Sequence, residues 1–183
     1  MNPSFNKNDL MMFKAYVAKA TNYFEFGSGG STVYVSKQKN IKSITSVESC
    51  REWHDNVKKL ITHPNIKYIF INMNTLPDTW GYPGEYSTRD SWVSYSSALN
   101  NSVDLILIDG RFRVACALKC FTTISNSTIV LFDDFLNRPE YHIVLDYYTI
   151  INKTVDNVMV ALQKNNSTPP SLELIQKYED IAG

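Results

Sequence analysis

The sequence has few of the features that mark disulfide-bonded, metal-binding or membrane-spanning proteins. Its three cysteines, Cys50, Cys116 and Cys120, are an odd, scattered set without Cys-x-x-Cys spacing. Such a set encodes neither a disulfide framework nor a zinc site, which favours an intracellular protein. No apolar run approaches the roughly 20 residues needed to cross a bilayer, and the N-terminus MNPSFNKND lacks the pattern of a secretory signal. We therefore expect a soluble, cytoplasmic protein without a membrane partner.

An excess of charge is also absent. The 18 Lys and Arg residues balance 18 Asp and Glu residues, so the formal net charge is zero. A nucleic-acid partner is therefore disfavoured, because no global field would hold a polyanion. Hydrophobic residues make up 44% of the chain, a globular composition that excludes disordered and fibrous proteins. The length of 183 residues favours a single domain. We expect this domain over residues 1–164, followed by a short appendage over residues 165–183.

From residue 22 onward, short apolar runs alternate with segments of helical period. This alternation predicts an α/β fold with a mostly parallel sheet covered by helices. A helix over residues 9–19 precedes the sheet, with Leu10, Phe13 and Val17 on one face. The parallel strands are expected over residues 23–26, 42–47, 67–71, 103–109 and 128–132.

Two later β-like runs, over residues 147–153 and 158–162, are separated by the turn-formers Asp156 and Asn157. We expect them to pair as an antiparallel hairpin at the edge of the sheet.

The segments between the strands carry two further signals. Ser49 and Glu52 have the spacing of a capping box, which predicts the start of a helix. The apolar face of that helix is expected to consist of Trp53, Val57, Leu60 and Ile61. The stretch 72–90 contains prolines and glycines and reads as a loop, and loops this long inside a compact domain are usually functional.

Acidic residues and a glycine-rich turn stand where the predicted parallel strands end. Ligands of open parallel sheets bind at this edge. The acidic residues there are Glu25, Glu48, Asp109, Asp133 and Asp134. The turn after Glu25 reads FGSGGST, and its glycines allow the backbone to approach a ligand closely. Because Thr32 stands in place of the third glycine of Gly-x-Gly-x-x-Gly, a dinucleotide is less favoured.

These motifs together resemble a known family. The run EFGSGG looks like the first motif of the class I S-adenosylmethionine (SAM)-dependent methyltransferases, and SVESCREW, LILIDGRFR and IVLFDDF follow in the family's order. The resemblance covers roughly residues 16–162. It implies a Rossmann-like three-layer sandwich, whose mostly parallel seven-stranded sheet ends in an antiparallel hairpin at the C-terminal edge. The pattern IDG with a later DD also resembles small-molecule and sugar O-methyltransferases, in which the matching carboxylates hold Mg²⁺.

The resemblance implies a set of donor-binding residues. Glu48 would accept hydrogen bonds from the ribose hydroxyls, for which a carboxylate is suited. Alternatively, it is a helix-capping acid. Glu25 would orient the glycine turn or accept from the methionine ammonium. Asn72, or the loop around Trp80, would meet the adenine, although Trp80 could equally be a lid or a core residue. The backbone beneath the methionine part would be that of Gly27, Ser28 and Gly29, with a plain tight turn as the alternative.

The resemblance also implies a reaction centre at the acidic residues that follow the fourth and fifth parallel strands. Asp109 could orient the acceptor hydroxyl, accept its proton or bind a cation, or it could simply cap the turn before Gly110. Asp133 and Asp134 would repel each other unless a cation or a basic residue lay between them. Asp109, Asp133 and Asp134 are thus candidate ligands of Mg²⁺, a cation that prefers oxygen. Arg111 and Arg113 could neutralise these acids instead, and they or Arg138 could hold an anionic acceptor.

We therefore expect SAM-dependent transfer of a methyl group to a hydroxyl of a small acceptor, such as a sugar or a nucleotide sugar. One rival is an NAD(P)-dependent oxidoreductase, because Glu48 could also hold an NAD ribose. Another is a SAM-fold binding module without catalysis. His54 and His142 are possible bases that are more often packed residues, and Cys116 and Cys120 are expected in the core. The short chain leaves little room for an acceptor cap, which a second subunit in a homo-oligomer could supply.

Overall fold

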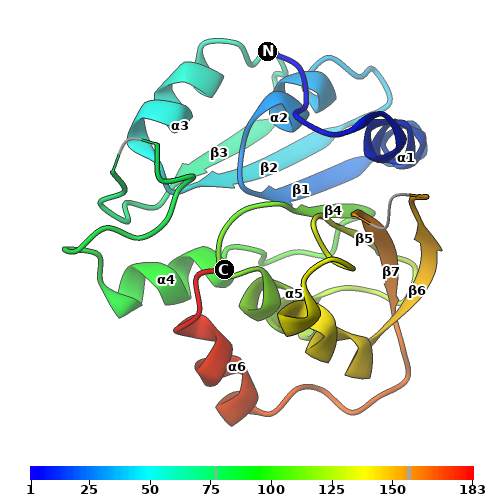
Figure 1. Cartoon of the computed structure of the whole chain (residues 1–183). Coiled ribbons are helices and arrows are strands. Elements are labelled where there is room, and N and C mark those ends of the chain that lie inside the picture. Colours follow the sequence, from blue (N-terminus) through cyan, green and yellow to red (C-terminus); the bar gives the residue numbers. More distant parts are fainter. Residues whose placement is uncertain (77, 156–157) are drawn as a thin grey trace.

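The computed structural model describes residues 1–76, 78–155 and 158–183, and it places a seven-stranded sheet between two layers of helices (Figure 1). In chain order the elements are α1 (Lys7–Val17), β1 (Asn22–Phe26), α2 (Gly30–Val35), β2 (Ser43–Glu48), α3 (Arg51–Lys58), β3 (Ile66–Phe70), α4 (Arg89–Ser96), β4 (Leu105–Ile108), α5 (Arg113–Thr123), β5 (Ile129–Phe132), the 3-10 helix η1 (Pro139–Asp146), β6 (Tyr148–Lys153), β7 (Val160–Lys164) and α6 (Leu172–Glu179).

The strand order is β3-β2-β1-β4-β5-β7-β6. The first five strands in this order are parallel, and β7 runs antiparallel to both β5 and β6. The predicted mostly parallel sheet with an antiparallel hairpin at its edge is therefore confirmed. The turn-formers Asp156 and Asn157 lie outside the described residues.

Alternating side chains on the strands fill two cores. Phe24 and Phe26 of β1 face α4 and α5, whereas Tyr23 faces the opposite side, where α1 packs. Figure 1 shows α1, α2 and α3 on one face of the sheet and α4, α5 and α6 on the other. Strand β4 is buried along its whole length, which explains its uninterrupted apolar sequence. None of the described helices is long and apolar enough to span a bilayer.

The start of α3 differs from the predicted capping box. Its N-cap is Cys50, whose side chain makes no capping hydrogen bond, so the predicted Ser49–Glu52 box is wrong. The Glu48 carboxylate instead accepts hydrogen bonds from the backbone N–H groups of Ser49 and Cys50, both at 2.8 Å. The helix ends at Lys58, before two of the four residues expected on its apolar face.

The C-terminal segment is anchored to the domain by ion pairs. Glu179 of α6 is 5% exposed and pairs with Lys119 of α5 and with Arg89 of α4. Arg89 Nε also lies 2.9 Å from Asp180 Oδ1. The segment that we expected as an appendage therefore covers α4 and α5.

Candidate functional site

The loops after β1 and β4 meet at the carboxyl edge of the sheet, where two glycines pack against each other. Gly27 has a φ of 88°, and a Cβ atom at this position would lie 2.7 Å from the Cα of Gly110. A Cβ on Gly110 would lie 2.0 Å from the Tyr95 hydroxyl and 2.8 Å from the Gly27 nitrogen. Only residues without side chains allow this approach. The glycine turn is thereby held beside Asp109, as the order of strands predicts.

Glu25 lies beneath the turn and is fully buried. Its carboxylate accepts hydrogen bonds from the hydroxyls of Tyr23 (2.8 Å), Ser46 (2.7 Å) and Thr32. Thr32 Oγ1 in turn accepts from the Gly29 backbone N–H at 2.9 Å. Burial raises the pKa of Glu25 to about 7, against the opposing effect of these donors. Through Thr32, Glu25 is linked to the Gly29 N–H of the turn, a geometry that the turn-orienting alternative requires.

Glu48 joins the glycine turn to the start of α3. Its Oε2 accepts from the Ser28 backbone N–H at 3.0 Å and from the Ser28 hydroxyl at 2.7 Å. Its Oε1 accepts from the two backbone N–H groups that precede α3. Burial raises the pKa of Glu48, and these hydrogen bonds oppose the rise. The capping alternative does not hold, because Glu48 is 5% exposed and the N–H groups that it binds precede the first residue of α3. Its hydrogen bond to the Ser28 hydroxyl is of the type that ribose would offer.

Trp53 reaches the same turn, although the sequence predicts it on the apolar face of a helix. Its indole Nε1 donates to the Ser28 carbonyl at 2.6 Å, and 43% of the residue is exposed. The core-face prediction for Trp53 is therefore wrong. Helical periodicity records which residues share a face, but it does not reveal that the β1 turn lies against this face. The pattern of residues between 48 and 53 carries no signal that would have found this contact.

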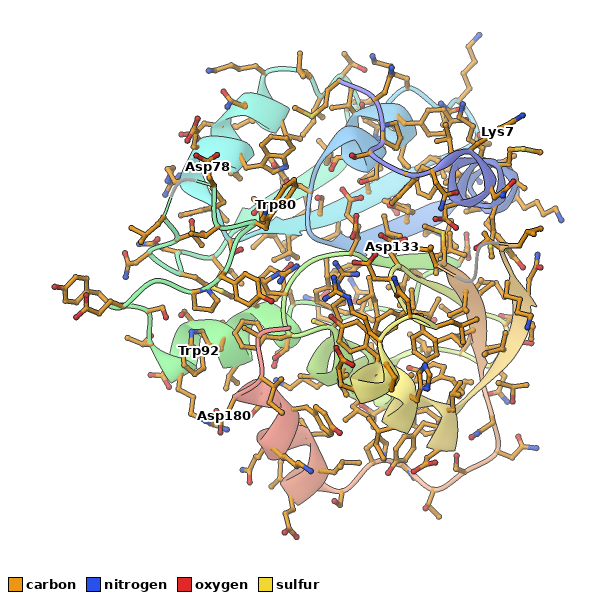
Figure 2. All side chains as sticks on the ribbon, viewed as in Figure 1. Lys7, Asp78, Trp80, Trp92, Asp133 and Asp180 are labelled. Atoms are coloured by element: carbon orange, nitrogen blue, oxygen red, sulfur yellow. The ribbon has the colours of Figure 1, made fainter. Side chains whose placement is uncertain are left out.

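The two predicted adenine-contacting residues lie in the loop after β3 and are both exposed. The side-chain oxygen of Asn72 accepts from the backbone N–H of Asn74 at 3.0 Å. Trp80 has a φ of 54° and is 89% exposed, at the position labelled in Figure 2. The same loop approaches the site at Gly81, whose carbonyl accepts from the Ser49 hydroxyl at 3.4 Å. Trp80 is therefore outside the core, on a loop that touches the end of β2.

Arg113 lies among the acids at the ends of β4 and β5. Its guanidinium is 3.3 Å from Asp109 Oδ1 and 3.3 Å from Asp134 Oδ2. It also donates to the backbone carbonyls of Gly110 (2.9 Å) and Asp133 (2.7 Å). The side chain is 4% exposed. Because Phe112 adopts a left-handed conformation with a φ of 54°, α5 begins at Arg113 directly beside these carboxylates.

This arrangement does not fit a Mg²⁺ site formed by Asp109, Asp133 and Asp134. A guanidinium occupies the position between Asp109 and Asp134 that a metal would need, and Arg138 Nη2 binds Asp134 from another side at 3.1 Å. Within residues 1–76, 78–155 and 158–183, no group of three or more His, Cys, Asp or Glu side chains could hold a metal. The alternative in which arginine neutralises the acids matches the structure.

Asp109 and Asp133 differ in their surroundings. The Asp109 side chain retains 32% exposure, more than Asp133. Burial raises the pKa of Asp109, while Arg113 opposes the rise. Asp133 is 9% exposed, labelled in Figure 2, and its Oδ1 has no hydrogen-bond partner among the described residues. Burial, with repulsion from Asp109 and Asp134, raises the pKa of Asp133 to about 8. These surroundings therefore favour the protonated form of Asp133.

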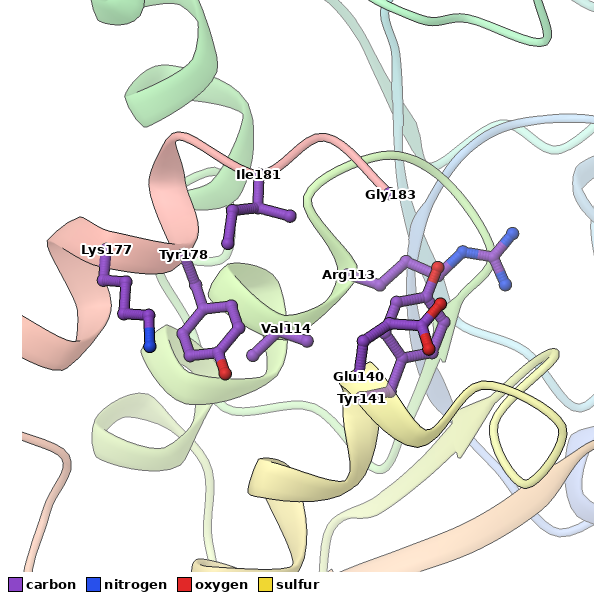
Figure 3. Close-up of a pocket in the computed structure, with 8 residues that line it drawn as sticks. All are labelled: Arg113, Val114, Glu140, Tyr141, Lys177, Tyr178, Ile181 and Gly183. Carbon is purple, nitrogen blue, oxygen red and sulfur yellow. The ribbon is translucent and has the colours of Figure 1, made fainter.

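A cavity of about 220 Å³ opens beside Arg113, between α5, η1 and α6 (Figure 3). Val114 and Ile181 line it together with Tyr141 and Tyr178, whose side chains come from η1 and α6. A second cavity, of about 420 Å³, lies beside Tyr68 and the residues that follow α3. Neither of these cavities is lined by the glycine turn.

The histidines and the cysteines of α5 have packed environments. His54 is buried and stacks on Tyr68 with ring centroids 4.3 Å apart. His142 Nε2 lies 3.2 Å from the Phe135 carbonyl. Cys116 and Cys120 are buried, and burial raises the pKa of both thiols, as expected of core residues.

No protein-family model and no curated protein matches the chain significantly. Solved structures do. A methyltransferase-like protein from Silicibacter pomeroyi is 24% identical, covers 97% of this chain and 96% of its own, and superposes with a TM-score of 0.83. This is the Rossmann-like methyltransferase fold.

Other structures with the methyltransferase fold are more distant. A ribosomal protein L11 methylase from Lactobacillus delbrueckii is 14% identical, with 87% of this chain and 81% of that chain covered and a TM-score of 0.55. Methanococcus jannaschii TYW2, solved in complex with AdoMet (SAM), is 9% identical, with coverages of 88% and 78% and a TM-score of 0.50. At these identities the likeness concerns the fold.

Proposed function

We propose that this protein is a SAM-dependent methyltransferase that methylates a hydroxyl group of a small acceptor, such as a sugar or a nucleotide sugar. One observation carries the proposal. In a methyltransferase fold, the glycine turn after β1 packs directly on the turn after Asp109, and Glu48 contacts the same glycine turn from β2. Residues for the donor and for proton transfer thus share one edge of the sheet.

The donor would be held by the residues around the glycine turn. Gly27, Ser28 and Gly29 leave room for the methionine part, and Glu48 would exchange its hydrogen bond with the Ser28 hydroxyl for those of the ribose. Glu25 would keep the turn in place from below. Asn72 and Trp80 are the proposed adenine contacts, and because Trp80 is exposed, this contact needs the loop to turn inward. When bound, SAM supplies a methyl group on a sulfonium, which is a good leaving group.

Asp109 is the proposed catalytic residue. Its half-buried carboxylate would orient the acceptor hydroxyl and take its proton, and the ion pair with Arg113 would fix the direction of the carboxylate. Alignment of acceptor and donor supplies most of the remaining acceleration, which can reach about 7 to 11 kcal/mol for well-oriented reactants. The proposal involves no metal, because Arg113 already occupies the position between the carboxylates.

The cavity beside Arg113 is the proposed acceptor site. Its volume of about 220 Å³ is below the roughly 300 to 1,000 Å³ of sites for drug-sized ligands, so it would enclose a single ring. A sugar ring would fit, and the rest of a nucleotide sugar would extend outside. The L11 methylase neighbour shows that this fold also serves a protein methylase. The acceptor class therefore rests on the cavity and on Asp109.

Calorimetric titration of S-adenosylhomocysteine and of NAD into the purified protein tests the donor. We expect binding of S-adenosylhomocysteine, with a dissociation constant on the order of micromolar, and none of NAD. NAD binding alone would replace the proposal with an oxidoreductase.

Turnover tests the reaction. Asp109→Asn should lower the rate of methyl transfer to the best acceptor of a panel of monosaccharides and nucleotide sugars by about 100-fold. Its affinity for S-adenosylhomocysteine should stay within about twofold of wild type. Full activity in this variant would contradict the role of Asp109, and donor binding without turnover on any acceptor class would favour a non-catalytic module.

A further inference from the structure

Arg111 is a buried cation without a carboxylate partner. It is 8% exposed, and its Nε has no hydrogen-bond partner among the described residues. Across the described chain, no ion pair of its guanidinium is found, whereas Arg89, Arg113 and Arg138 each pair with at least one carboxylate. A buried charge is costly unless it is paired and hydrogen-bonded. A ligand that supplies acceptor atoms would compensate the burial of the unpaired Arg111 guanidinium.

The position of Arg111 links the glycine turn to the cavity. Arg111 follows Gly110, which packs on Gly27. Its guanidinium carbon lies 4.4 Å from the centre of the Tyr82 ring. One terminal nitrogen lies 2.9 Å from the position that a Cβ on Gly183 would take, and Gly183 also lines the cavity beside Arg113. Arg111 thus follows the turn that packs on Gly27, and its guanidinium lies beside a residue that lines the cavity.

The acids around this position are already neutralised. Arg113 pairs with both Asp109 and Asp134, and Arg138 adds a second partner to Asp134. Burial and repulsion from Asp109 and Asp134 disfavour the charged form of Asp133. Arg111 is therefore the arginine of this cluster without a carboxylate partner among the described residues, which favours an anion.

We propose that Arg111 binds an oxyanion, a carboxylate or a phosphate, of a ligand at this site. A guanidinium offers parallel N–H donors that match both groups in two-point fashion. Stacking on the Tyr82 ring, at 4.4 Å, holds the plane of the guanidinium. The inference rests on the proposed function for the identity of the ligand, since the oxyanion can be the amino-acid carboxylate of the donor or an anionic group of the acceptor.

Three titrations distinguish these sources. S-adenosylhomocysteine carries the donor carboxylate, 5′-methylthioadenosine keeps the nucleoside thioether without it, and inorganic phosphate probes an acceptor anion. Each is titrated by calorimetry into the wild-type protein, Arg111→Gln and Arg111→Lys. The matched control is Lys164→Gln, which removes another cation stacked on an aromatic ring, 4.5 Å from the centre of Phe121 and on β7. Thermal unfolding verifies that each variant is folded. If Arg111→Gln does not fold, Arg111→Lys, which keeps the positive charge, still tests the guanidinium.

If the donor carboxylate is the ligand, both Arg111 variants bind S-adenosylhomocysteine at least tenfold more weakly than the wild type does. Their affinity for 5′-methylthioadenosine changes less than twofold. If an acceptor anion is the ligand, phosphate binds the wild type and the control, and it binds the Arg111 variants at least tenfold more weakly. Equal affinities of the wild type and the variants for S-adenosylhomocysteine, together with absent or equal phosphate binding, overturn the proposal. Failure of S-adenosylhomocysteine to bind the wild type would contradict the proposed function, and the phosphate titration would still decide whether Arg111 is an anion site.

Discussion

Glu25 illustrates how one buried carboxyl couples the glycine turn to pH. Its pKa in the folded protein is about 7 because of burial, whereas an unfolded glutamate titrates at about 4.3. Between these values the folded state holds a proton that the unfolded state has released. The stabilisation is therefore fully present below about pH 4.3 and is lost as the pH rises through 7.

We expect Glu25→Gln to remove this part of the pH dependence. The free energy of unfolding of the wild type should fall by up to about 3 kcal/mol between pH 4.5 and 7.5 from Glu25 alone, and the variant should show a correspondingly smaller fall. Urea unfolding across this range measures the effect, with the exposed Glu52→Gln as the control. Parallel pH profiles for the wild type and Glu25→Gln would show that Glu25 ionises normally in the folded state.

Some residue-level features of the site could be predicted from the sequence. The shared position of Glu25, Glu48 and Asp109 could be predicted, because each lies at or within one residue of the end of a recognisable strand, and strand ends meet at one edge of a parallel sheet. The contact of Trp53 with the turn could not be predicted, because it depends on how closely α3 approaches β1. The sequence left open whether metal or arginine neutralises the acids. The left-handed backbone at Phe112, which places Arg113 there, is a conformation that a phenylalanine seldom adopts.

At the scale of elements, the packing of the β1 and β4 loops depends on Gly27. Gly27→Ala would place a methyl group 2.7 Å from the Gly110 backbone, at a φ that disfavours side chains. We expect a loss of about 2 kcal/mol or more in the free energy of unfolding, measured by urea denaturation.

Gly29→Ala is the matched control for this substitution. The atom of another residue nearest to its added Cβ would be the Trp53 indole nitrogen, at 3.6 Å, which is ordinary contact. Its stability should therefore stay closer to wild type. Equal destabilisation by the two alanines would contradict the account of loop packing.

The docking of α6 depends on the buried carboxylate of Glu179. Glu179→Gln removes the negative charge of this side chain, so Lys119 and Arg89 each lose their ion pair with it. Breaking one partner of a buried ion pair costs about 3 to 5 kcal/mol, and Arg89 is nearly half exposed, so we expect the lower end, about 3 kcal/mol. Urea unfolding measures this loss, with Glu173→Gln on the exposed first turn of α6 as the control. A variant as stable as the control would show that the helix is held by its apolar contacts alone.

The elements themselves follow from sequence more readily than their anchors. The short apolar runs predict the parallel strands and the edge hairpin. The clearest case is β4, because a strand that is buried on both faces has an uninterrupted apolar sequence. The docking of α6 could not be predicted, since Arg89 and Glu179 are 90 residues apart and neither carries a local signal.

For the whole molecule, the sheet order and the comparison with solved structures agree on a methyltransferase fold, and the acceptor is the part that neither determines. The cavity between α5, η1 and α6 is closed by a segment whose position the sequence does not reveal. A formal net charge of zero gives no global steering of a charged acceptor. Recognition would therefore depend on local groups such as Arg111.

Whether the glycine turn and Glu48 form the donor site can be measured by amide-resolved NMR during titration with S-adenosylhomocysteine. We expect the amide signals of Ser28, Gly29 and Ser49 to shift most. Glu48 accepts hydrogen bonds from the N–H groups of Ser28 and Ser49, and Gly29 follows Ser28 as the N-cap of α2. Saturable shifts that leave these three signals in place, or no shifts at all, would contradict this donor site.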